Sequence, residues 1–154
     1  MKHEIEACAK HAREEVGSRE SCFPGLGVLW QLLRTEGLRV RDGPLPYSYV
    51  DTNTGQRVIV RDRKQPRRDD DWVLWEEVGH DRLVAWGHVR QPVATGSRAE
   101  CSNDLRSEAW AQLWIRAFLL PREAVSTHLP EGVGEIAELA GVPLEMVQAR
   151  LQDL

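Results

Sequence analysis

The spacing of apolar residues changes along the chain and divides it into helical and extended segments. Apolar side chains recur every three or four residues over residues 2–16 and again over Leu26–Thr35, which is the period of a helix with one buried face. Gly17 and Gly37 follow these segments, and glycine is common just after the end of a helix. This part of the chain therefore predicts two amphipathic helices.

A different pattern occupies the next part of the chain. Leu38–Arg41 alternates apolar and polar residues, Tyr47–Val50 is rich in residues that favour strands, and Val58–Val60 is a β-branched run. Asn53–Gly55 carries a turn signal between the last two segments. We expect three short strands that form a small antiparallel sheet.

Helical spacing returns after these strands. It begins at Asp69–Asp71, three acidic residues of the kind that stabilise a helix N-terminus, and it runs to Gly87. Residues 88–103 have the composition of a loop. Further helices are predicted at Asp104–Leu120, in a short segment that Pro121 opens, at Val133–Ala140 and at Pro143–Leu151. The predicted fold class is α+β and mainly helical, in a single domain of residues 1–154.

Composition and charge narrow the classes of function. The chain has 154 residues, 42% of them apolar and 29% charged, which is the balance of a globular domain. Its formal net charge of −4 argues against nucleic acid as the partner. One stretch is basic and precedes Asp69–Asp71, and we expect it to be a solvated loop. Its cationic residues are Arg57, Arg61, Arg63, Lys64, Arg67 and Arg68.

The cysteines and the apolar runs bear on the compartment. Cys8, Cys22 and Cys101 are odd in number and scattered, so they predict reduced thiols in a cytoplasmic protein. The charged N-terminus lacks the apolar stretch of a signal peptide. No apolar run approaches the ~20 residues that a membrane-spanning helix needs, so we expect no membrane partner.

The stretch Trp75–His80 carries the candidate chemistry. In a zinc peptidase helix of the form H-E-x-x-H, two ligands four residues apart lie on one face and bind one metal, and the Glu beside the first ligand activates its water. Glu77 and His80 occupy the positions of the base and the second ligand, and Glu76 stands where the first His would be. Taken alone, this E-E-x-x-H pattern also fits an ordinary helix surface with one His.

The sequence around this motif resembles the ImmA/IrrE metallopeptidase family along nearly the whole chain. The stretch Trp72–His80 is similar to the family's F-T-x-A-H-E-L-G-H helix, with Gly79 before the last His, and Arg67-Arg68 stand where the family has an Arg-containing segment. Glu108–Pro121 is similar to a helix that ends in three apolar residues and Pro, and Ile136–Pro143 is similar to the closing helices. The resemblance implies a zincin-like fold.

The resemblance also implies roles for individual residues. His80 would bind zinc, Glu77 would be the general base and Glu108 would be the third ligand. The chain departs from the family at Glu76, and at Trp110 where the family has a second Glu. A carboxylate can bind zinc, so a Glu76/His80/Glu108 site is possible, but its extra negative charge would weaken the metal as a Lewis acid. The alternative is a site without zinc.

Two other features leave alternatives open. Tryptophans are frequent around the motif helix and the glutamate helix, where they predict core packing or, if exposed, an anchor for a partner; they are Trp72, Trp75, Trp86, Trp110 and Trp114. Ile136–Leu151 has a helix-turn-helix pattern, but its second helix offers a single cation, Arg150, so we interpret it as a packing element.

The sequence leads to two hypotheses about function. The first is a regulatory protein of the ImmA/IrrE type that acts on a protein partner, such as a helix-turn-helix repressor of a phage or mobile element, with impaired or absent catalysis because Glu76 replaces a ligand. The second is an active zinc endopeptidase with a Glu/His/Glu site. A third hypothesis, which the helix-turn-helix pattern of Ile136–Leu151 suggests, is a DNA-binding module.

Overall fold

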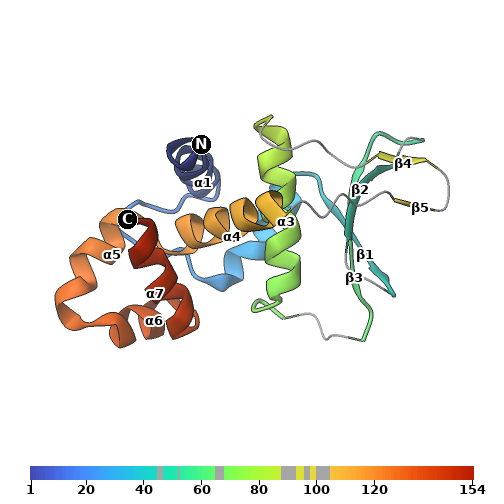
Figure 1. Ribbon diagram of the computed structural model, residues 1–154. Helices are drawn as coiled ribbons and strands as arrows, with labels where there is room; N and C mark the ends of the chain where they lie inside the picture. Colours follow the sequence, from blue (N-terminus) through green and yellow to red (C-terminus); the bar gives the residue numbers. More distant parts are fainter. Residues whose placement is uncertain (45–46, 52, 65–67, 88–92, 96–97, 100–104) are drawn as a thin grey trace.

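Residues 1–44, 47–51, 53–64, 68–87, 93–95, 98–99 and 105–154 are described in a computed structural model of the chain. The fold is α+β with helices predominating, as the sequence predicts (Figure 1). The helices are α1 (Lys2–Glu15), α2 (Leu29–Thr35), α3 (Trp72–Ala85), α4 (Leu105–Leu119), α5 (Arg122–His128), α6 (Val133–Ala140) and α7 (Leu144–Asp153), with 3₁₀ turns at Leu26–Val28 and Leu129–Glu131. The strands are β1 (Arg39–Gly43), β2 (Tyr47–Asp51), β3 (Arg57–Asp62), β4 (Val93–Thr95) and β5 (Arg98–Ala99).

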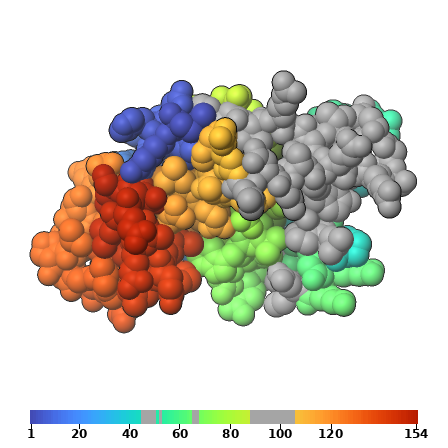
Figure 2. All heavy atoms as spheres, in the orientation of Figure 1, coloured from blue at the N-terminus to red at the C-terminus, as the bar shows by residue number. Residues whose placement is uncertain are grey.

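The sheet lies at one end of the molecule and α5–α7 lie at the other, with α3 and α4 between them (Figures 1 and 2). The strand order is β1-β3-β2-β4-β5. Only part of the expected antiparallel sheet is present, because β2 pairs with β3 antiparallel while β1 pairs with β3 in parallel. The chain reverses direction once between β1 and β2 and once between β2 and β3, so β3 runs in the same direction as β1. Because β3 lies between β1 and β2 in the sheet, it pairs with β1 as a parallel strand.

Two strands occupy part of the segment that composition predicts to be a loop. β4 adds to β2 in parallel, and β5 pairs with β4 antiparallel. The loop prediction is therefore wrong at Val93–Thr95 and Arg98–Ala99, because strands this short show no period in the sequence. Arg67, Cys101 and Asp104, which the sequence analysis also considered, lie outside the described residues.

The core joins α1, α2, α3 and α4. Trp75 and Trp114 are fully buried, and both rings contact Phe118, with centroid separations of 5.6 and 5.2 Å. The prediction of core tryptophans is confirmed for these two, whereas Trp86 is 40% exposed. Among the described residues, no helix is long and apolar enough to cross a membrane.

The basic stretch contributes to the interior as well as to the surface. Arg61 is buried, with its Nε 2.7 Å from a carboxylate oxygen of Asp42. Arg57 donates to the buried carboxylate of Asp81 at 2.7 Å and to the backbone oxygen of Glu36 at 2.7 Å. The expectation of a solvated loop is wrong at these two arginines, because they lie on β3, where Arg57 pairs with the buried carboxylate of Asp81 and Arg61 lies 3.7 Å from the buried carboxylate of Asp71.

Candidate functional site

The candidate site lies where α3 packs against α4. Gly79 of α3 is buried, and a Cβ atom at this position would come within 3.2 Å of the backbone oxygen of Ala111 and 3.4 Å of its Cα. Contacts of this length with backbone atoms leave little room for a side chain, so glycine permits the close approach of the two helices. The Gly that precedes His80 in the motif therefore has a structural reason here.

On one side of this approach, His80 meets Glu108. The Nε2 atom of His80 lies 3.3 Å from Oε2 of Glu108, and the two side chains are 16% and 37% exposed. The fold thus brings together two residues that the family resemblance assigns to one zinc site, although they are separated by 28 positions in the chain. A single imidazole and a single carboxylate at this distance can share a proton or provide two ligands to a cation.

On the other side of the approach, Glu76 meets Gln112. The Gln112 side-chain amide donates a hydrogen bond to Oε1 of Glu76 at 2.7 Å. Glu76 precedes His80 by four residues and Gln112 follows Glu108 by four, so one helical turn separates the two contacts on each helix. The sequence analysis did not identify Gln112, and its spacing from Glu108 is the signal that could have indicated it.

Glu77, the residue in the position of a general base, is half-buried on α3. It follows Glu76 directly, so it projects about 100° further around the helix than the residue that meets Gln112.

These positions do not reproduce a three-ligand zinc site. Catalytic zinc sites use three protein ligands, and in the part of the chain that the structure describes no three His, Cys, Asp or Glu side chains gather as a metal site requires. The carboxylate of Glu76 is directed to an amide donor, which leaves His80 and Glu108 as the pair in contact. Within the described part of the chain, the residues therefore do not assemble the three-ligand zinc centre that the resemblance implies.

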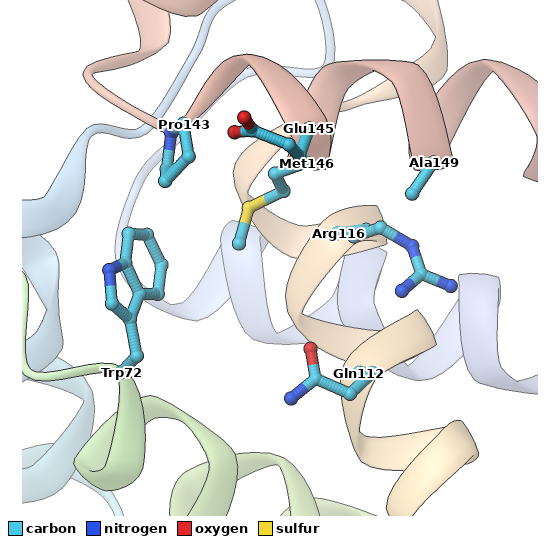
Figure 3. A pocket seen from close by; sticks show the side chains of 7 residues that line it. All are labelled: Trp72, Gln112, Arg116, Pro143, Glu145, Met146 and Ala149. Carbon is cyan, nitrogen blue, oxygen red and sulfur yellow. The ribbon is translucent and has the colours of Figure 1, made fainter.

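A cavity of about 310 Å³ adjoins the Glu76–Gln112 contact (Figure 3). Its lining comes from three helices and the residue before α7: Trp72, Gln112, Arg116, Pro143, Glu145, Met146 and Ala149. Trp72 lies one turn before Glu76 on α3, and Arg116 lies one turn after Gln112 on α4. The cavity thus continues the packed surface of α3 and α4 toward α7, which the sequence patterns did not indicate.

The helix-turn-helix pattern corresponds to α6 and α7, but its one cation is not at the surface. Arg150 is fully buried, where it donates to the backbone oxygen of Leu120 at 2.9 Å and pairs with Glu6. A guanidinium group held in this way is not available to a phosphate backbone.

A scan of protein-family models, a search of curated proteins and a search of solved structures each found no match for this chain.

Proposed function

We propose that this chain is a regulatory domain of the ImmA/IrrE metallopeptidase type that acts by binding a protein partner and does not use a catalytic zinc. The partner that the proposal favours is a helix-turn-helix repressor of a phage or mobile element. The observation that carries the proposal is the hydrogen bond between Glu76 and Gln112, which commits the substituted ligand position to a contact within the protein.

The order of the elements also supports a zincin-like scaffold. Two helices, three strands, the motif helix and the glutamate helix follow one another in the order that the resemblance implies. The burial of Arg150 supports a protein partner over DNA. A cytoplasmic location belongs to the same proposal, and free thiols at Cys8 and Cys22 are compatible with it.

Metal content tests the catalytic part of the proposal. We expect protein purified without chelators to contain well under one zinc per chain by elemental mass analysis, and we expect Glu76→His to raise that content, because it restores an imidazole one turn from His80. About one zinc per chain in the wild type, lost in His80→Ala, would contradict the proposal.

Retained partner binding tests the regulatory part. The Glu77→Ala variant should regulate its target and bind a candidate repressor as the wild type does, since the proposal gives Glu77 no proton to transfer. A repressor that is cut by the wild type and left intact by Glu77→Ala would show that the chain is a peptidase.

The second candidate, an active endopeptidase, is favoured by one specific observation. His80 and Glu108 are in contact at 3.3 Å, so two of the three implied ligands are already together. The same zinc measurement decides between the candidates, because an active site needs the metal and a partner-binding site does not.

A further inference from the structure

The cavity between α3, α4 and α7 has the walls of a binding pocket for one apolar side chain. The indole of Trp72 closes one end, the Met146 side chain projects into the middle, and Pro143 and Ala149 complete the apolar wall (Figure 3). Its volume of about 310 Å³ is at the lower end of the range of about 300–1,000 Å³ that small-ligand sites have. A pocket of this size suits a single bulky side chain.

The charges around the pocket are unequal. Arg116 lines one end, but its guanidinium is paired with Asp153 through Nε–Oδ2 and Nη2–Oδ1 distances of 2.6 and 3.3 Å. Glu145 is exposed at the rim and has no ion-pair partner among the described residues. Glu76, beside the pocket, meets the uncharged amide of Gln112. The lining therefore carries one carboxylate, that of Glu145, without an ion-pair partner among the described residues, and this favours a cationic group on the partner.

Gln112 connects this pocket to the candidate site. Its amide nitrogen donates to Glu76, while its oxygen is directed into the space below Met146 (Figure 3). That oxygen has no hydrogen bond to another described residue, so it can accept one from the backbone N–H of a bound segment. The pocket is thus continuous with the candidate site at the contact of α3 and α4.

We infer that this pocket anchors a partner segment by a bulky apolar side chain with an adjacent Lys or Arg. The inference rests on the proposed function, and it adds the chemistry that the partner must present. Trp72 and Met146 bury the apolar side chain, and Glu145 pairs with the cation. A DNA-binding repressor fits this requirement, because such proteins carry clusters of basic residues.

The test uses methyl-labelled methionine in the whole chain and three short probes. Met146 lies in the pocket and Met1, the other methionine, is 52% exposed at the N-terminus, so one signal reports binding and the other is an internal control. The probes are the N-acetyl amides of Leu-Arg, Leu-Glu and Ala-Arg. We expect Leu-Arg to shift the Met146 methyl saturably and to leave Met1 unchanged. Compared with Leu-Arg, Leu-Glu should bind about fivefold more weakly, and Ala-Arg should bind more weakly by a factor of about ten or more.

Variants separate the pocket from the rest of the surface. Ala149→Trp should fill the cavity and abolish the Met146 shift, with Ala149→Leu as a smaller filler if the larger one does not fold. Gln148→Trp is the matched control, because residue 148 is exposed on the same helix and does not line the cavity. Glu145→Gln should remove the preference for Leu-Arg over Leu-Glu.

Equal binding of Leu-Arg and Ala-Arg, or an unchanged Met146 shift in the filled variants, would overturn the inference. These outcomes are independent of zinc content. If the chain contains zinc and still binds Leu-Arg, the pocket inference stands and the proposed non-catalytic function is wrong. If the chain contains no zinc and binds none of the probes, the pocket inference is wrong and the proposed function stands.

Discussion

At the scale of single residues, Gly79 and Asp81 show how two positions of α3 serve different neighbours. Gly79 faces the backbone of Ala111 on α4. Asp81, two residues later, is buried against the sheet and accepts a hydrogen bond from Arg57 of β3. The absence of a side chain at Gly79 therefore lets α3 pack closely against α4, and the buried carboxylate of Asp81 links the same helix to the sheet.

Substitution of Gly79 by Ala should destabilise the fold. The added Cβ would lie 3.2 Å from a backbone oxygen that cannot move independently, so we expect a loss of about 1–3 kcal/mol in the free energy of unfolding by urea denaturation. Gly134→Ala on α6 is the control, since a Cβ there meets nothing within 4 Å, and it should be neutral or slightly stabilising. Equal stability of the two variants would contradict the close approach.

The carboxyl of Asp81 should make stability depend on pH. Burial raises its pKa to about 6 from 3.8, against the opposing effect of Arg57, so the folded chain holds a proton that the unfolded chain has lost between these values. The free energy of unfolding should therefore fall as pH rises from about 4 to 6, by on the order of 3 kcal/mol from this group, and then level off.

The Asp81→Asn variant isolates this contribution. The difference in unfolding free energy between wild type and variant, measured by urea denaturation at several pH values, should change across pH 4–6 and stay constant above about pH 7. Parallel curves over the whole range would show that Asp81 does not titrate in this window.

At the level of secondary-structure elements, the N-terminus of α3 is held by the side chain of Asp71. Asp71 precedes the helix, and its Oδ1 accepts a hydrogen bond from the backbone N–H of Leu74 at 3.1 Å. Its other carboxylate oxygen lies 3.7 Å from a guanidinium nitrogen of Arg61 on β3. The same side chain therefore caps the motif helix and links it to the sheet.

Removal of this cap should weaken α3. Asp71→Ala is expected to cost about 1–2 kcal/mol in chemical denaturation, because one N-terminal amide loses its acceptor and Arg61 loses a neighbouring charge. Asp70→Ala, which removes a surface ion pair with Arg68, should change stability by less than about 1 kcal/mol. A cost as small for Asp71→Ala as for Asp70→Ala would show that the cap does not hold the helix.

At the scale of the whole molecule, Arg150 joins the two ends of the chain. It lies on α7, pairs with Glu6 of α1 and donates to the backbone oxygen of Leu120, the residue that follows α4. Burial opposes ionisation of Glu6, but the hydrogen bond and the charge of Arg150, together with the charges of Arg122 and Arg13, lower the pKa of that carboxyl. This contact therefore helps to hold α7, which forms one wall of the pocket, against α1 and the end of α4.

Loss of this cation should be costly. Arg150→Ala leaves Glu6 half-buried without its partner, and we expect a loss of about 3–5 kcal/mol in thermal or urea unfolding. Adding Glu6→Gln should recover part of the loss, because the stranded charge is removed. Arg34→Ala, at an exposed position on α2, is the control and should have little effect. If Arg150→Ala lowered the free energy of unfolding as little as the control variant does, the contacts of Arg150 would not be what stabilises α7.

Local sequence patterns are sufficient to place the helices, because helical periods, glycine stops and Asp71 act over a few neighbouring residues. It also indicated, through the family resemblance, that His80 and Glu108 belong together, and these residues are in contact. The helix positions can be predicted from local patterns, and the contact between His80 and Glu108 can be predicted from the order of the motifs that the chain shares with the family it resembles.

Three features follow from tertiary packing and not from local patterns: the lateral order of the strands, the pairing of Glu76 with Gln112 and the pocket beside α7. The sequence shows that the chain reverses between β2 and β3, but it does not show that β3 lies between β1 and β2. Glu76 could have faced a metal or an amide, and the close approach at Gly79 brought Gln112 within hydrogen-bonding distance. These features depend on which distant segments pack together, and the spacing of residues along the chain does not encode that choice.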